Sequence, residues 1–383
     1  MKMMKRFAAL ALALVLMMSL AACGGAMSEG SRTDGIFYEA TGVSPDAVLM
    51  RVDGVDVNAE SYFYQLYNMV SNIVMYCGAD GFDGDSGDGR TFAELCREYT
   101  MQSVKEIAVV ETLAKENGLT LNAEQLAQLE EEIAAYEGEY GEFGFRYMGI
   151  TRETMEELYK AFGCYDLLNE SVYVEGSALA PTEEDLLAYA EESGLMKADH
   201  ILLMTMDINT GAALDEAAKQ AQYAKAEEIL AQLQAAEDLE TLFAELGDAF
   251  SEDTGRIAYP EGYVFGEGEM VIEFENAAKE LAVGEISGIV ESTYGYHILL
   301  RKALSAEEIL ADGNYFSSVL KKSTDGAKVE YSDIFNEKVA QLDLGAFYTA
   351  VSDARDTLYT EYLAEQEANA DSSEAEGGEE AVG

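Results

Sequence analysis

The sequence is poor in basic side chains and in histidine. Lysine and arginine number 24 against 73 aspartates and glutamates, which leaves a formal net charge of −49. A chain of this charge repels phosphate backbones, and no basic stripe runs along it, so DNA and RNA binding are not expected. With two histidines, four cysteines and no C-x-x-C spacing, a structural zinc site is not expected either.

Long apolar runs are also scarce, and the first 22 residues contain the main one. Three basic residues open this segment, and the apolar run from Phe7 to Met18 is too short for a good membrane span. The sequence Leu-Ala-Ala-Cys-Gly then surrounds Cys23 and resembles the lipobox of bacterial lipoproteins. The resemblance implies cleavage before Cys23 and a lipid on its sulfur, which would be the only membrane anchor. The alternative is an ordinary secretory signal with a chance cysteine.

Three cysteines remain beside Cys23, namely Cys77, Cys96 and Cys164. The sequence allows two states for these cysteines. One is a single disulfide, for which Cys77 and Cys96 are the closest pair in sequence, and the other is buried free thiols. An acidic segment that begins at Asp83 has part of an EF-hand spacing. Its sixth position is an aspartate where the calcium loop needs glycine, so a solvated loop is expected and no metal is assigned.

The texture of the chain changes several times after the signal. A strand turns at Asp53-Gly54, and long amphipathic helices follow, one of which starts at Asn122 with Gln125 as its capping-box partner. Beyond residue 199, strands and helices alternate in an α+β pattern. The expected segments are a signal peptide (1–22), a flexible tether (23–46), a helical domain (47–176), a linker helix (177–194), an α+β domain (195–303), C-terminal helices (304–365) and a disordered acidic tail (366–383).

Both histidines of the chain open matching strand sequences, His200-Ile-Leu-Leu and His297-Ile-Leu-Leu. Other short motifs accompany them in a fixed order. The pattern resembles the parvulin-type peptidyl-prolyl isomerases over residues 195–303, which implies a small antiparallel sheet with surrounding helices. The motifs that carry the resemblance are FSEDTG at 250–255, FGEGEM at 265–270, GEIS at 284–287 and GYHILLR at 295–301.

The parvulin resemblance implies functions for seven side chains. The two histidines would hydrogen-bond at the floor of the site, Asp253 would lie beside the substrate amide, and an apolar pocket would hold the proline ring. Such a site lowers the barrier of about 18–20 kcal/mol to amide rotation without a covalent step, a metal or a cofactor. The implied catalytic residues are His200, Asp253 and His297, and the implied substrate-binding residues are Phe265, Met270, Phe274 and Tyr263, the last filling a space left by Gly262.

The flanking segments resemble SurA- and PrsA-like secretion foldases, beginning with VDGVDVNAESYFY at 52–64. In those families the helices after the isomerase fold back on the N-terminal domain. The resemblance therefore implies that the α+β domain is inserted in a helical chaperone domain built from both ends of the chain. An independent helical hairpin over 305–365 is the alternative.

Together these features predict a foldase that is anchored by lipid on the outer face of a bacterial membrane, the cytoplasmic one or, where the host has one, the outer one. It would bind unfolded secreted chains and isomerise their X–Pro bonds. A non-enzymatic holdase, whose parvulin domain only binds peptide, is the alternative. A solute-binding lipoprotein would need two lobes with parallel strands, which the helical flanks oppose. Phosphopeptide preference is not expected, because the loop after the first strand reads MDINTG where phosphate-directed parvulins are basic.

Overall fold

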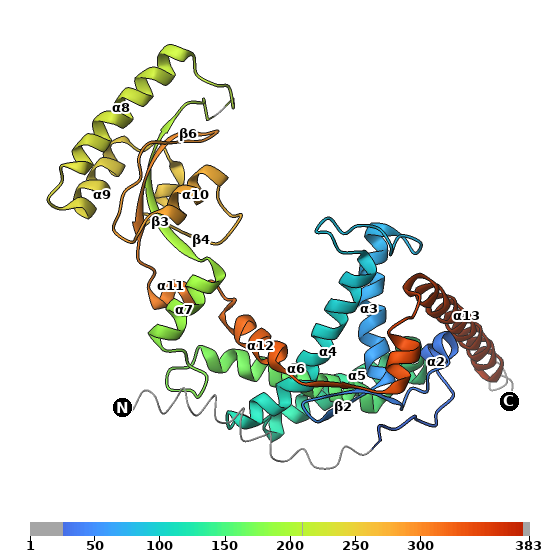
Figure 1. Ribbon diagram of the computed structural model, residues 1–383. Helices are drawn as coiled ribbons and strands as arrows, with labels where there is room; N and C mark the ends of the chain where they lie inside the picture. Colours follow the sequence, from blue (N-terminus) through green and yellow to red (C-terminus); the bar gives the residue numbers. More distant parts are fainter. Residues whose placement is uncertain (1–25, 209, 378–383) are drawn as a thin grey trace. The chain divides into compact units, whose positions relative to one another are not determined.

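The protein consists of two compact units, shown in Figure 1 as a computed structural model that describes residues 26–208 and 210–377. Unit 1 contains the described residues up to Glu170 and those from Leu320 onward, and unit 2 is Ser171–Val319. Unit 2 is therefore an insertion between two segments that build unit 1 together. This confirms an α+β domain inserted in a mainly helical domain formed by both ends of the chain.

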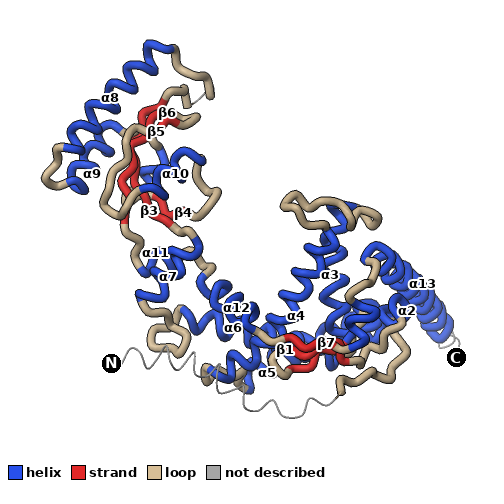
Figure 2. The backbone as a smooth tube through the Cα atoms, viewed as in Figure 1, coloured by secondary structure: helices blue, strands red, loops and turns tan. Residues whose placement is uncertain are grey.

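Unit 1 combines a small antiparallel sheet with long helices. Its strands have the order β2-β1-β7, so the C-terminal strand pairs with the N-terminal hairpin. Figure 2 marks these strands in red. The elements are β1 (Val48–Val52), β2 (Val55–Asn58), β7 (Val329–Tyr331), α2 (Ile36–Thr41), α3 (Ala59–Cys77), α4 (Phe92–Glu116), α5 (Ala123–Met148), α6 (Arg152–Val172), the π-helical turn η3 (Phe335–Val339) and α13 (Leu344–Gly377), with α6 continuing into unit 2.

Local sequence signals set the boundaries of these elements. Asp53 and Gly54 have φ values of 47° and 88°, as a two-residue hairpin turn requires, and they connect β1 to β2. Asn122 caps α5, and the side chain of Gln125 completes the capping box. The turn and the capping box that the sequence predicts are both confirmed.

The C-terminal segment is part of the core of unit 1. The Ser332 hydroxyl donates a hydrogen bond to the Leu49 carbonyl at 2.9 Å, next to the β1–β7 pairing. Phe347 of α13 lies in an aromatic cluster with ring centroids 5.7–6.3 Å from its neighbours. Removing this segment would therefore uncover one edge of β1 and the cluster. The other rings of the cluster are Phe37, Phe63 and Tyr67.

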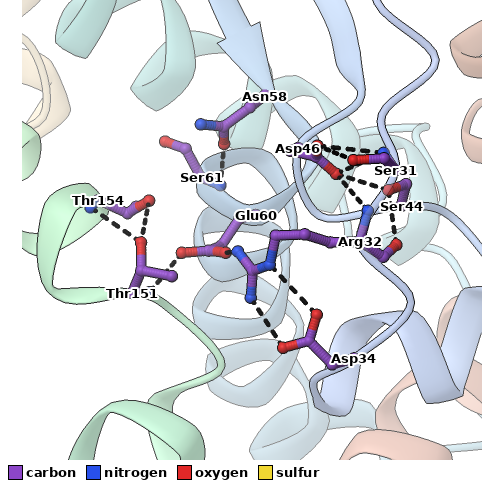
Figure 3. Close-up of polar contacts among 10 residues, drawn as sticks. All are labelled: Ser31, Arg32, Asp34, Ser44, Asp46, Asn58, Glu60, Ser61, Thr151 and Thr154. Carbon is purple, nitrogen blue, oxygen red and sulfur yellow. Dashed lines mark hydrogen bonds and ion pairs between the residues drawn. The ribbon is translucent and has the colours of Figure 1, made fainter.

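Residues 26–46, here called the N-terminal strap, are packed against unit 1, so the flexible tether expected over 23–46 is wrong for this part. Asp46 accepts hydrogen bonds from the backbone N–H groups of Ser31 and Arg32, both at 2.9 Å (Figure 3). The Arg32 guanidinium donates to the buried carboxylate of Glu60 at 2.6 Å. Phe37 is only 2% exposed. The glycine- and serine-rich composition concealed these few anchoring side chains.

Unit 2 is built on a four-stranded antiparallel sheet with the order β4-β3-β6-β5. Helices α8 and α9 cover one face of it, and α10 covers the other (Figure 1). The elements are α7 (Glu183–Ser193), β3 (Met196–Met204), α8 (Glu216–Gln234), α9 (Leu239–Phe250), the 3-10 turn η2 (Thr254–Ile257), β4 (Tyr263–Phe265), α10 (Ile272–Glu280), β5 (Val290–Glu291), β6 (Gly295–Lys302), α11 (Ala306–Ala311) and α12 (Tyr315–Gly326), which continues into unit 1.

Alternation along the two central strands decides which side chains face each layer. Ile201 and Ile298 pack in the core under α8 and α9, whereas Ala198 and Leu299 pack in the core under α10. Because successive strand residues point to opposite faces, positions 200 and 297 share the α10 face. The pairing register sets Leu202, two residues beyond His200 on β3, opposite His297 of β6.

The first part of the C-terminal segment departs from expectation. Residues 304–319 were expected to pack on the N-terminal domain together with the rest of 304–365. Instead α11 packs against α7 inside unit 2, where Ile309 joins a cluster with Tyr189 and Leu195. The Tyr189 hydroxyl also donates to Asp312 at 2.6 Å. The apolar face of the short helix α7 needs this partner, so the chain returns to unit 1 only at Leu320.

The cysteines and the C-terminal helix differ in how well they match the expectations from sequence. Cys77, Cys96 and Cys164 are free thiols, and burial raises the pKa of Cys96 to about 12. Helix α13 continues to Gly377, so the disorder expected from residue 366 is wrong up to this point, where an alanine- and glutamate-rich sequence favours helix. No helix among the described residues has the length and apolar character of a membrane span. The signal segment, Cys23 and residues 378–383 lie outside the described residues.

Candidate active site

Two imidazole rings meet on the α10 face of the sheet. The Nδ1 atoms of His200 and His297 are 3.0 Å apart, and the rings stack with an interplanar angle of 15°. Both side chains are buried, at 7% and 3% exposure. A hydrogen bond between two Nδ1 atoms needs one donor and one acceptor, so at least one of the rings is neutral.

The histidine pair is the centre of a longer hydrogen-bond chain. At one end His200 Nε2 lies 2.9 Å from Asp253 Oδ2, and at the other His297 Nε2 lies 2.6 Å from Ser292 Oγ. The Tyr294 N–H donates to the same Ser292 oxygen at 3.1 Å. One tautomer assignment satisfies every member: Ser292 donates to His297, His297 donates to His200, and His200 donates to the carboxylate.

Electrostatics agree with this assignment. Burial lowers the pKa of His297 well below its ordinary value, and the nearby His200 lowers it further. Burial raises the pKa of Asp253, but hydrogen bonds from His200, Tyr263 and the Gly255 N–H outweigh this effect and leave the pKa below its ordinary value. The site therefore holds a neutral His297 imidazole and an ionised Asp253 carboxylate at neutral pH.

Asp253 is held more tightly than the sequence suggested. Its side chain is 16% exposed, and it caps the turn η2 by accepting a hydrogen bond from the Gly255 N–H at 3.0 Å. Arg256 of the same turn forms an ion pair with the buried Asp199 at 2.5 Å, and Asp199 also accepts from the His200 N–H at 2.7 Å. The backbone around Asp253 is thereby fixed to β3.

An apolar wall stands beside the histidines. The Phe274 ring is edge-on to His200, with centroids 5.2 Å apart at 82°, and edge-on to His297, at 5.9 Å and 84°. Phe265 contacts Phe274 edge-on at 5.6 Å, and Met270 packs against the same cluster. Phe265 and Phe274 are 1% and 3% exposed, so this wall also forms part of the core under α10.

The structure brings all seven sequence-predicted side chains into this one region. It assigns Tyr263 a polar contact that the sequence did not indicate, because the phenol donates to Asp253 at 2.6 Å. Sequence reasoning also missed Ser292, which lies five residues before His297. Only the turn between β5 and β6 brings its hydroxyl to the ring. The described residues contain no group of three or more His, Cys, Asp or Glu side chains suited to a metal ion.

Comparison with known proteins gives a consistent picture. Residues 200–303 match the family model described as the PPIC-type PPIASE domain of the rotamases. The foldase protein PrsA of Halalkalibacterium halodurans is 28% identical over 229 residues, which is 57% of this chain and 62% of that protein. PrsA of a Geobacillus species is 32% identical over 161 residues, covering 41% and 49%. The chain thus spans less than two thirds of the length of these relatives.

A solved structure matches over a longer part of the chain. The crystal structure of PrsA from Bacillus subtilis is 18% identical in sequence and has a TM-score of 0.24. The match covers 83% of this chain and 93% of that one.

Proposed function

We propose that the parvulin-type domain formed by residues 200–303 catalyses cis–trans isomerisation of X–Pro peptide bonds, and that the whole chain is an extracytoplasmic foldase. The observation that carries this proposal is the pair of imidazoles 3.0 Å apart, joined to Asp253 and walled by Phe274. The rotamase family match over the same residues supports the reaction type. The relatives named as foldase PrsA support the wider function.

The chemistry needs no covalent intermediate. Partial double-bond character gives the amide a rotation barrier of about 18–20 kcal/mol, and a twisted amide loses that character. Phe265, Met270 and Phe274 would hold the proline ring while the rest of the peptide turns. The hydrogen-bond chain from Ser292 to Asp253 presents fixed dipoles that do not have to reorganise during the rotation, so it can favour the twisted state.

The proposed clients are polypeptides that fold after export. Uncatalysed X–Pro isomerisation takes tens of seconds or more, which makes it a slow step in folding. We further propose that a lipid on Cys23 holds the protein on the outer face of the bacterial membrane. Support for this part comes from the lipobox-like sequence around Cys23. The substitution Cys23→Ala should then leave an unprocessed or released protein, and a fully processed, membrane-bound variant would contradict the lipid anchor.

The isomerase proposal is tested by the exchange of a prolyl peptide between its cis and trans forms, measured by NMR with the full-length protein. The wild type should accelerate exchange. Phe274→Ala should weaken peptide binding because it removes apolar contact with the proline ring. A matched control is Phe243→Ala, which truncates a buried phenylalanine of α9 in the core under the other face of the sheet. A wild type that suppresses client aggregation without accelerating exchange would overturn the enzyme in favour of a holdase.

A further inference from the structure

Tyr263 takes part in the hydrogen bonding of the site although it is the first residue of a short edge strand. Its hydroxyl donates to Asp253 Oδ2 at 2.6 Å, and this oxygen also lies 2.9 Å from His200 Nε2. The phenol ring packs edge-on to the His200 ring, with centroids 5.7 Å apart at 75°. One side chain therefore contacts both members of the imidazole–carboxylate pair.

The backbone leaves room for this hydroxyl at Gly255. A Cβ on Gly255 would lie 1.9 Å from the Tyr263 Oη atom, which is closer than any real contact. A second glycine, Gly262, precedes the tyrosine with φ +97°, and a Cβ there would lie 2.8 Å from the Ala198 carbonyl oxygen of β3. Glycine is the residue that adopts such a φ without strain. The phenol thus reaches Asp253 because Gly255 lacks a side chain, and Gly262 lets the start of β4 lie close to β3.

We propose that Tyr263 is a positioning residue of the isomerase site, whose hydroxyl holds the Asp253 carboxylate in the orientation that faces His200. This inference rests on the proposed function for its catalytic consequence, but the hydrogen-bond function itself can be tested without activity. With Asp253 fixed as an acceptor, His200 Nε2 must be the donor in this contact. The Nδ1 contact with His297 continues the hydrogen-bond chain on the other side of the ring.

Among the described residues, the Asp253 carboxylate has two side-chain hydrogen-bond partners, the imidazole of His200 and the phenol of Tyr263. Burial raises the pKa of the Tyr263 hydroxyl, and Asp253 raises it further, so the phenol remains a donor throughout the neutral range. The titratable and charged groups around Asp253 are His200 and Asp199 on β3, Tyr263 on β4, His297 on β6, Arg256 on η2, and Tyr259 between η2 and β4.

The composition of the chain makes the test direct. The sequence contains only two histidines, so histidine-selective ¹⁵N labelling of the full chain reports on His200 and His297 alone. Tyr263→Phe keeps the ring and removes the hydroxyl. Tyr259→Phe is the matched control, because this tyrosine is 55% exposed and its ring lies tilted beside that of Tyr263, with ring centroids 5.0 Å apart.

We expect Tyr263→Phe to raise the pKa of Asp253 by about one unit, since a hydrogen bond to a charged group is lost. The ¹⁵N shifts of the ring bonded to Asp253 should change with pH at a correspondingly higher pH, and the acid limb of the isomerase pH profile should move with them. Tyr259→Phe should change neither. In an Asp253→Asn background, Tyr263→Phe should have much less effect, because the charge on which it acts is gone.

The outcomes separate the two proposals. Unchanged histidine titration and an unchanged pH profile in a folded Tyr263→Phe variant would overturn the positioning function and leave the tyrosine as a packing residue. Shifted histidine titration in a protein without isomerase activity would support the hydrogen-bond function and overturn the proposed enzyme. If Tyr263→Phe does not fold, a wild type with a ¹³C-labelled Tyr263 ring still tests the contact: its shifts should change as Asp253 is protonated at low pH, and shifts that do not change would overturn the hydrogen bond.

Discussion

The carboxylate of Asp253 stabilises unit 2 as well as shaping its site. Asp253→Ala should leave three donors without an acceptor, those of His200, Tyr263 and the Gly255 N–H. We expect a loss of about 1–3 kcal/mol in unfolding free energy together with the loss of activity. This loss of unfolding free energy can be measured by chemical denaturation, with unfolding monitored through hydrogen exchange of the β3 amides. The control is Glu273→Ala, which removes an exposed carboxylate. An Asp253→Ala variant as stable as this control would show that the carboxylate contributes only to substrate contacts.

The buried ring of His297 should make unit 2 sensitive to mild acid. Its pKa in the folded protein lies below that of an unfolded histidine, about 6.5. Between these two values the unfolded chain binds the extra proton, so stability is complete above about pH 6.5 and falls as the pH decreases.

Hydrogen exchange of β6 amides, corrected for intrinsic rates, should therefore report lower stability at pH 5.5 than at 7.5. The variant His297→Gln, which lacks the titrating ring, should show a flatter dependence. Equal pH dependence in the two proteins would contradict a neutral buried His297. Carboxylates whose pKa is lowered by folding titrate below this window, and Asp199, whose pKa is raised by burial, is present in both proteins and so does not account for a difference between them.

Single residues also show what the sequence could and could not predict about the site. His200 and His297 were predicted because each opens a recognisable motif on its own strand. The hydroxyls of Ser292 and Tyr263 carry no such signal, since serine and tyrosine are common and their partners are distant in sequence or on other elements. Hydrogen bonds of this kind depend on ångström-scale placement by the whole sheet, which periodicity does not encode.

At the scale of elements, the position of β4 depends on Gly262, the residue directly before the strand. Gly262 is buried with φ +97°, and an added Cβ would meet the backbone of β3. Gly262→Ala should therefore destabilise unit 2 by about 1–3 kcal/mol and disturb Tyr263. Gly288→Ala is the matched control, because an added Cβ there has no neighbour within 4 Å.

Thermal unfolding of both variants, with β4 followed by hydrogen exchange, measures this difference. Gly262→Ala should melt at a lower temperature than the wild type, and Gly288→Ala should remain close to it. If the two alanine variants melted together, β3 and β4 would have to accommodate the extra methyl group by moving apart, and the strained φ would not limit the strand.

Elements with local signals were predicted best. The capping box at Asn122 and the turn at Asp53-Gly54 lie within four residues of sequence and need no tertiary partner. Helix α11 was assigned to the wrong unit because its apolar residue Ile309 suits either partner. Its contact with α7 is decided by chain geometry rather than by pattern.

At the scale of the whole molecule, unit 1 should require both ends of the chain. A chain that ends at residue 319 lacks β7 and Phe347, so one edge of β1 and the aromatic cluster would be uncovered. We expect this truncation to aggregate or to remain partly unfolded in unit 1. A chain that ends at residue 368 keeps both features and should fold.

Limited proteolysis and circular dichroism distinguish the two truncations. Protease resistance of residues 48–170 in the shorter chain would show that the N-terminal segment folds alone, contrary to the insertion described above. Unit 2 should remain resistant in both chains, because its sheet and cores lie within Ser171–Val319.

The N-terminal strap has a consequence for where the protein works. The Ser28 carbonyl already accepts a hydrogen bond from the Val48 N–H at 2.8 Å. An extended chain spans at most ~3.6 Å per residue, so the five steps from Cys23 to Ser28 reach no farther than about 18 Å. A lipid at Cys23 would therefore keep Ser28, and with it the nearest part of unit 1, within about two nanometres of the bilayer.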